Sequence, residues 1–137
     1  MVQGETVIRV RYQETDQMGV AYHANFLVWF ELGRTELMRR LGLPYLEFEE
    51  NDLFLPVIKA TCEYKAPARY DDELRVITRL EKLHAVRLTF TYEVRRQGTL
   101  LARGCTEHAV VNKKGRPVVL KKWSPSLWER LCNAVES

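Results

Sequence analysis

The sequence predicts an α+β domain in which a five-stranded antiparallel sheet wraps around one long helix, with a further helix at the C-terminus. One basis is the segment 26–41, which has helical spacing and no polar face over its first two turns. The other is a set of later segments in which apolar residues recur at every second position. A helix that starts apolar on all sides is typical of burial. Short turns between alternating segments indicate antiparallel strands, on which such a helix must pack.

The chain begins with an alternating segment, 6–12, that predicts a strand with an inward face of Thr6, Ile8, Val10 and Tyr12. A polar turn and the long helix follow, and we expect the helix to end near Gly42. A short second helix is expected over 45–51. The start of the long helix has no polar side, so we expect the rest of the chain to enclose it. Its apolar residues are Phe26, Leu27, Val28, Trp29, Phe30 and Leu32.

Four further strands are expected over 55–66, 73–83, 86–95 and 100–111, joined as a meander. Pro67 marks an edge or a bend, since proline cannot donate to a ladder. The clearest alternation places Val86, Leu88, Phe90, Tyr92 and Val94 inward. On one face of the last strand the side chains are small, so something bulky can lie across Ala102, Gly104 and Thr106. Ser124 and Pro125 are typical of a helix start, and the C-terminal helix carries an apolar stripe of Leu127, Leu131 and Val135.

Composition narrows the class of protein. The 137 residues suggest a single domain, 1–137, and the charge of +3 is spread among acids rather than gathered in the basic stripe of a nucleic-acid binder. Cys62, Cys105 and Cys132 form no C-x-x-C pair, so we expect reduced thiols in a cytoplasmic protein and no metal, cofactor or disulfide. No apolar run reaches the roughly 18 residues of a membrane span, and the first residues do not resemble a signal peptide.

A single curved sheet around one helix leaves apolar surface uncovered, so we expect a homo-oligomer. Gly33 lies inside the long helix, where glycine costs about 1 kcal/mol relative to alanine. We therefore expect another backbone to approach the helix closely at this position.

The turn ahead of the long helix is the candidate reaction centre because it carries an acid, Asp16, next to a helix start. Free N–H groups and the positive end of the helix dipole point at whatever binds there. Tyr12 and Thr15 are placed to hydrogen-bond the Asp16 carboxylate. The alternative is that Asp16 only caps the turn or the helix, as aspartate often does.

The segment YQETDQMGVAYHANFLVWFELGRTELMRRLGL resembles the signature of the hotdog-fold acyl-CoA thioesterases, in the 4-hydroxybenzoyl-CoA thioesterase-like branch that includes the YbgC proteins. The segment YKAPARYDDELRVITRL is similar to the same branch. The resemblance covers roughly residues 5 to 120. It implies a hotdog fold, hydrolysis of an acyl-CoA thioester without a cofactor, and a homodimer or homotetramer. The resemblance does not identify the acyl group of the substrate.

Carried over by position, the resemblance implies that Asp16 is the catalytic acid and that the backbone amide of His23 polarises the thioester carbonyl. Gly19 matches the glycine that lets the turn approach the substrate, beside Val20 and Tyr12. For the phosphates of CoA, basic residues are needed near the mouth of the site. The candidates are Lys65 and Arg69, followed by Arg87, Lys113, Lys114 and Arg116.

Three alternatives stay open. Other hotdog thioesterases place the acid inside the long helix, which makes Glu31 the second candidate base, although pairing with Arg34 three residues on is also expected. Hydratases of the R-specific type have a histidine five residues after the aspartate, where this chain has Ala21. A protein that binds acyl thioesters without hydrolysing them is the third.

Overall fold

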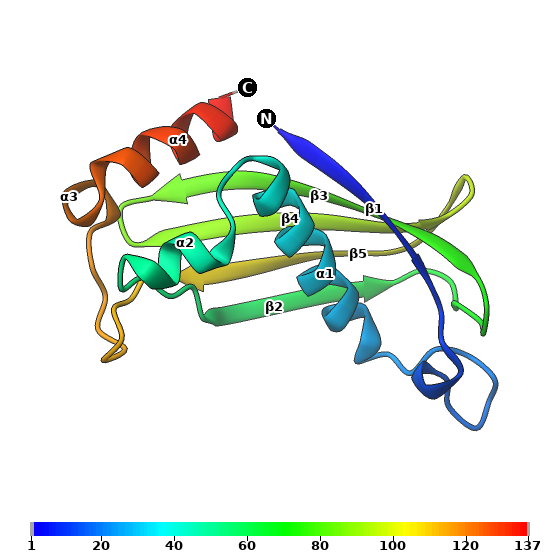
Figure 1. The fold of residues 1–137 in the computed structure, drawn as a ribbon. Helices are drawn as coiled ribbons and strands as arrows, with labels where there is room; N and C mark the ends of the chain where they lie inside the picture. The colour runs from blue at the N-terminus through cyan, green and yellow to red at the C-terminus, as the bar shows by residue number, and fades with distance from the viewer. Residues whose placement is uncertain (1, 137) are drawn as a thin grey trace.

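The computed structural model describes residues 2–136 and shows one five-stranded antiparallel sheet, ordered β1-β3-β4-β5-β2, with the longest helix lying across one of its faces (Figure 1). The expected α+β architecture is confirmed. The elements are β1 (Gln3–Arg9), a 3-10 turn (Tyr12–Glu14), α1 (Asn25–Arg40), α2 (Tyr45–Glu50), β2 (Val57–Tyr64), β3 (Glu73–His84), β4 (Arg87–Arg96), β5 (Thr99–Ala109), α3 (Leu120–Trp123) and α4 (Pro125–Glu136).

The expected meander of four strands is wrong for β2, which pairs with β5 instead of β3. The segment 65–72 carries the chain across the end of the sheet. It starts with the amides of Lys65 and Ala66 bonded to Leu101 O, and ends with the Asp71 amide bonded to Val10 O. Alternation predicts that a segment is a strand but does not predict which edge it joins. Only β3, β4 and β5 are a meander.

The first strand begins and ends earlier than expected, at Gln3 and Arg9. Its ladder with β3 stops because Val10 bonds the 71–72 turn, accepting from the Asp71 amide and donating to Asp72 O, each at 2.9 Å. Tyr12 then opens the 3-10 turn with 77% of its surface exposed. The expectation that Tyr12 faces inward is therefore wrong.

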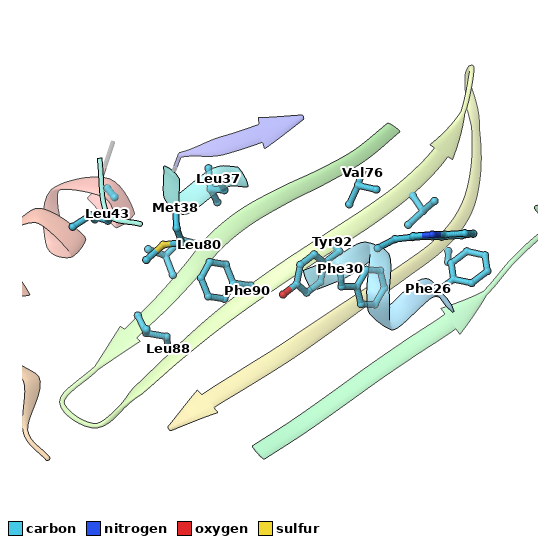
Figure 2. Packing of buried hydrophobic residues seen from close by; sticks show 14 of the residues in the cluster. Phe26, Phe30, Leu37, Met38, Leu43, Val76, Leu80, Leu88, Phe90 and Tyr92 are labelled. Carbon is cyan, nitrogen blue, oxygen red and sulfur yellow. The ribbon is translucent and has the colours of Figure 1, made fainter. Parts of the chain in front are cut away.

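Helix α1 buries one side only. Phe26, Trp29, Phe30, Leu37 and Met38 are buried against the sheet, and Figure 2 shows their neighbours in the core. Leu27, Val28 and Leu32 are 41%, 43% and 45% exposed. The expectation that one chain encloses the whole helix start is wrong, because a single sheet covers a single side.

A bulky side chain of α1 lies across the small face of β5, as its sequence predicts. A Cβ on Gly104 would lie 2.4 Å from Phe30 Cε2 and 2.6 Å from the Thr61 carbonyl oxygen. The Phe30 ring stacks on Tyr92 of β4, with centroids 4.3 Å apart and planes 7° apart (Figure 2). Phe30 thus fills the space that a side chain at position 104 would need.

Gly33 marks a second close approach, but not to another backbone. A Cβ there would lie 2.4 Å from Thr78 Oγ1 and 2.9 Å from Val76 Cγ1, which are side-chain atoms of β3. The residue lets α1 settle on the sheet of its own chain. The close approach is confirmed, and its expected partner is wrong.

The C-terminal segment closes the end of the sheet that carries the β3–β4 hairpin (Figure 1). The Leu127 amide donates to Ser124 Oγ at 3.5 Å, and Leu127 and Leu131 are buried, as the stripe predicts. The one-turn helix α3 was not expected. Among the described residues, no helix is long and apolar enough to cross a membrane.

Replacing Gly104 with alanine should destabilise the fold by about 2–3 kcal/mol, because overpacking would push against a ring and a backbone carbonyl that cannot move freely. Urea denaturation measures the effect. Gly98→Ala is the matched control, since no atom lies within 4 Å of the added methyl group. Equal unfolding midpoints for the two variants would contradict this packing.

Candidate functional site

The turn ahead of α1 is a small hairpin that fixes Asp16 at its tip. The Asp16 amide donates to Val20 O and the Tyr22 amide to Glu14 O, each at 2.8 Å. Gly19 takes the left-handed conformation, φ +79°, that this tight turn requires. Asp16 Oδ1 accepts from the Met18 amide at 2.8 Å. Its second carboxylate oxygen accepts no hydrogen bond from the part of the chain described.

The partners expected for Asp16 are not those observed. Thr15 Oγ1 donates to the Tyr12 carbonyl at 2.6 Å, and the Tyr12 ring lies against Tyr70, with centroids 5.7 Å apart. The expectation that Tyr12 and Thr15 hold the carboxylate is therefore wrong, because its own turn does so. Asp16 does act as a cap, but this uses only one of its oxygens.

Glu14 anchors the hairpin and was missed in the sequence. Its side chain is buried, Oε2 accepts from Trp29 Nε1 at 3.0 Å, and Oε1 accepts from the Arg11 amide at 2.8 Å. The Asn25 side chain donates to the Glu14 carbonyl at 2.8 Å. A buried indole N–H needs an acceptor, so Trp29 on an apolar helix was the available signal. Periodicity gives no hint that Glu14 is that acceptor.

His23 lies at the helix start, and its backbone N–H donates to no acceptor within residues 2–136. Its carbonyl accepts from Tyr64 Oη of β2 at 2.9 Å, which ties the helix start to the edge strand. Burial, followed by the hydrogen bond and charge of Cys62, raises the pKa of Tyr64 to about 12. The Tyr64 hydroxyl therefore keeps its proton and donates to the His23 carbonyl at neutral pH. This hydrogen bond holds the helix start in place, while the His23 N–H has no acceptor among the described residues.

Asp16 and His23 line two different hollows of the chain. Asp16, Tyr12, Gly19 and Tyr70 line one of about 660 Å³. The other, of about 350 Å³, is bounded by Ala21, His23, Phe26, Tyr64, Lys65, Ala66 and Pro67. The structure brings Tyr12 and Gly19 to Asp16, and Lys65 to His23, but it does not join the two groups in one pocket.

The basic candidates separate in the same way. Val20 pairs with Arg69 in an isolated bridge, so Arg69 is beside the hairpin, while Lys65 pairs with Glu63 at 3.1 Å. The other candidates, in the turn 112–117 and at the start of β4, lie at the opposite end of the sheet from the hairpin (Figure 1). Of the basic candidates from the sequence, all of them in the described chain, Lys65 and Arg69 are the two that lie near the candidate site.

Glu31 and Arg34 do not form the expected pair: across residues 2–136, neither takes part in an ion pair within 4.0 Å. Glu31 is exposed, and both residues line a cavity away from the hairpin. The three cysteines are free, half-buried thiols. In the described chain, no three His, Cys, Asp or Glu side chains are grouped so as to hold a metal ion.

The sequence model of a family described as the Thioesterase-like superfamily matches residues 10–131. The chain belongs to this superfamily. A protein named acyl-CoA thioester hydrolase YbgC, from Escherichia coli, is 37% identical over 95 residues, which are 69% of this chain and 71% of the relative. One named acyl-CoA thioesterase YbgC, from Haemophilus influenzae, is 32% identical over 84% of this chain and 86% of its own length.

The solved structures agree with the superfamily assignment. A crystal structure titled as a DHNA-CoA thioesterase from Staphylococcus aureus has a TM-score of 0.92 and 32% identity, and the similarity covers 97% of this chain and 91% of that one. The hotdog fold that the sequence resemblance implied is confirmed. The family resemblance itself, to thioesterases of the YbgC type, is confirmed as well.

For this thioesterase-like chain, Glu14→Gln should lower the free energy of unfolding by about 1–3 kcal/mol. Glutamine offers one acceptor oxygen to two buried or half-buried donors, the Trp29 indole and the Arg11 amide, so one donor loses its partner. Thermal and urea denaturation measure the loss. Gln13→Ala, at the exposed neighbouring position, is the control. Unchanged stability in both variants would show that Glu14 does not anchor the hairpin.

Proposed function

We propose that the protein is an acyl-CoA thioesterase that hydrolyses an acyl- or aroyl-CoA thioester to the free acid and CoA. The names of the relatives support the activity. The observation that carries the proposal is that one short segment holds two unused groups, which line neighbouring parts of the hairpin and the helix start in separate hollows of the single chain. Among the described residues, Asp16 has a carboxylate oxygen without a partner, and seven residues later the His23 amide is a donor without an acceptor.

Thioester hydrolysis needs a base or nucleophile at the carbonyl carbon and a donor where negative charge develops on oxygen. Asp16 would supply the first, either by attacking the carbon to form a mixed anhydride that water then cleaves, or by taking a proton from the attacking water. In both routes the thiolate of CoA is the leaving group. The His23 amide would supply the second, an interaction worth about 2.7–4 kcal/mol per donor in such sites.

The remaining candidates would bind rather than react. Tyr12, Gly19 and Val20 would contact the thioester arm, because they form or border the hairpin that carries Asp16. Lys65 and Arg69 would meet the phosphates of CoA, as the basic candidates near the site. The backbone of the hairpin would leave room for the arm at Gly19, where no atom lies within 4 Å of a Cβ position.

We also propose that the protein acts as a homodimer or homotetramer. Within residues 2–136, strand β2 pairs only with β5, so its other edge is free of any described strand, and Val57 and Ile58 on it are 45% and 49% exposed. Free edges and apolar patches of this kind are normally covered. A second chain paired along β2 would cover the exposed side of α1, and would bring a second set of site residues to the first.

One domain over residues 1–137 is part of the proposal, supported by the single sheet and its one hydrophobic core, although Met1 and Ser137 lie outside the described residues. A reducing compartment such as the cytoplasm is supported by the free state of all three cysteines.

Val28→Lys combined with Leu32→Lys should convert the oligomer to a monomer, because two charges would have to be buried at the contact. Light scattering at micromolar concentration checks the mass. Leu46→Lys is the control, since Leu46 is 64% exposed on α2 and lies outside the proposed contact. A parent protein that runs as a monomer would refute the assembly.

Asp16→Asn should lower turnover of acyl-CoA substrates at least about a hundredfold, within the range for general base catalysis. The variant keeps a side-chain oxygen for the Met18 amide, so the fold and substrate binding should change little. Free CoA, measured with a thiol reagent over a panel of acyl-CoAs, gives turnover and substrate preference together. Glu31→Gln is the control and should affect stability or assembly more than chemistry.

Two results would contradict the proposal. An Asp16→Asn enzyme that keeps more than a tenth of the parent's turnover would exclude Asp16 as nucleophile or base, and Glu31 would become the first candidate. A parent protein that binds acyl-CoAs and releases no CoA from any of them would be a binding protein with Asp16 as a turn cap.

A further inference from the structure

A second cavity, separate from the hollows that Asp16 and His23 line, lies between α1 and α2, away from the hairpin. It measures about 190 Å³, and its lining includes apolar walls from α2 and from the segment before β2. A cavity of about 150 Å³ is enough to hold benzene, so this one can hold a ring with a small substituent. The lining residues are Glu31, Arg34, Tyr45, Phe48, Glu49, Leu53, Phe54 and Leu55.

The cavity has more hydrogen-bond donors than acceptors in its inner part. The Tyr45 hydroxyl is buried and makes no hydrogen bond of regular geometry in the described chain, although the Arg34 guanidinium, a donor, lies close to its oxygen. Burial is the main reason that the pKa of Tyr45 is raised, so the hydroxyl keeps its proton and can donate. Arg34, half-buried beside it, forms no ion pair within 4.0 Å with any described residue. A buried donor without an acceptor is costly unless a ligand supplies one.

The nearby polar groups of the core are bonded to one another, and their hydrogen bonds run in a fixed direction. The Leu55 carbonyl can only accept, so His108 Nδ1 donates to it at 2.9 Å and Nε2 is an acceptor. Thr106 Oγ1 then donates to Nε2 at 2.8 Å, and Tyr92 Oη donates to Thr106 Oγ1 at 2.5 Å. The chain of donors starts at Tyr92 and ends at the carbonyl of Leu55, which lines the cavity, so this acceptor already has a donor.

Arg34 is the dominant charge inside the cavity. Burial raises the pKa of Tyr45 and Tyr92, and the positive charge of Arg34 is the largest opposing influence on both. The charge of Glu31 is the smallest of the influences on Tyr45 and is not among those on Tyr92. Glu31 and Glu49 are exposed, so water screens their charges at the mouth of the cavity.

We propose that this cavity binds a carboxylate carried on a small apolar body, held by the Arg34 guanidinium and the Tyr45 hydroxyl. A guanidinium offers two parallel donors to a carboxylate, and the phenol adds a third. The ring or short chain that carries the carboxylate lies against Phe48, Leu53 and Phe54. The ligand has two possible sources: the far end of an acyl group, which rests on the proposed thioesterase function, or a free acid, which does not.

The binding test uses benzoate and its neutral analogue benzamide, titrated into the purified protein by NMR. Benzoate should bind saturably and at least about tenfold more tightly than benzamide. Arg34→Gln should weaken benzoate binding by at least about tenfold. The control Arg39→Gln, an exposed arginine on the same helix that pairs with Glu36, should leave it unchanged.

Two more variants separate binding from folding. Tyr45→Phe removes a hydroxyl that makes no hydrogen bond of regular geometry, so the melting temperature should stay at or above the parent value while benzoate binds more weakly. Glu31→Gln removes a negative charge from the cavity mouth and should tighten binding, opposite in sign to Arg34→Gln. Equal binding of benzoate and benzamide, or Arg34→Gln binding like Arg39→Gln, would overturn the proposal.

Turnover distinguishes the two sources. If the carboxylate belongs to the acyl group, Arg34→Gln should lower kcat/KM for acyl-CoAs with a terminal carboxylate and spare those with a terminal methyl group. If the carboxylate belongs to a free acid, Arg34→Gln should change kcat/KM for the two kinds of acyl-CoA by the same factor. The variant should also lose its affinity for benzoate. A protein that binds benzoate through Arg34 but hydrolyses no thioester would refute only the proposed function. A protein that hydrolyses thioesters without Arg34-dependent binding would refute only the pocket.

Discussion

The position of α1 depends on the contact between Phe30 and the bare backbone of Gly104. A side chain on β5 at this point would occupy the space of the Phe30 ring and would also meet the Thr61 carbonyl of β2. With nothing there, the ring stacks on Tyr92 and α1 lies directly on the sheet. Three residues that shape the candidate sites lie on this helix or just before it. His23 precedes its first turn, Trp29 reaches back to Glu14, and Arg34 lines the second cavity. Because a packed interior does not deform smoothly, fixing the helix at one point fixes these groups relative to the sheet.

Two acids on the same hairpin have opposite environments, although they are two residues apart. Side chains alternate sides along an extended backbone, so residues two apart would share a side. Glu14 and Asp16 differ because the 3-10 turn that ends at Glu14 and the hairpin interrupt the alternation. Glu14 is buried, and both of its oxygens accept hydrogen bonds from the protein. Asp16 keeps one oxygen without a partner at the tip of the turn. A reacting carboxylate has to stay accessible while its loop stays rigid. In this hairpin the two requirements fall on different residues.

The sequence predicted those features that depend on local pattern. Alternation in β4 placed Leu88, Phe90, Tyr92 and Val94 inward, and the small residues of β5 predicted that a bulky group lies across them. Features that depend on distant partners were not predictable in this way. The edge that β2 joins is set by the path of 65–72, and the exposure of Leu27 and Val28 depends on how far one sheet reaches around the helix. In the candidate site, Asp16 was predicted from its place ahead of the helix start and from the family motif, and the His23 amide from the motif alone. Glu14 and Tyr45 were not predicted, since a buried acceptor and a hydroxyl without an acceptor are visible only when the surrounding atoms are in place.

The exposed apolar stripe of α1, formed by Leu27, Val28 and Leu32, lies next to the cavity between α1 and α2. The proposed subunit contact and the proposed ligand site are therefore adjacent. Residues three and four apart share a helix face, so Glu31 lies on the same stripe as Leu27 and Val28, and Arg34 follows it by three positions. A partner helix laid on the proposed contact would therefore also cover the mouth of the cavity.

Glu31 has no ion pair within the described chain, so covering it would remove its carboxylate from water without compensation unless the partner or a ligand supplies a donor. Within the described chain Glu31 is thus the point at which assembly and ligand binding would influence each other. The same contact that screens the apolar stripe would strengthen the field of Arg34 inside the cavity, because excluding water lowers the local dielectric.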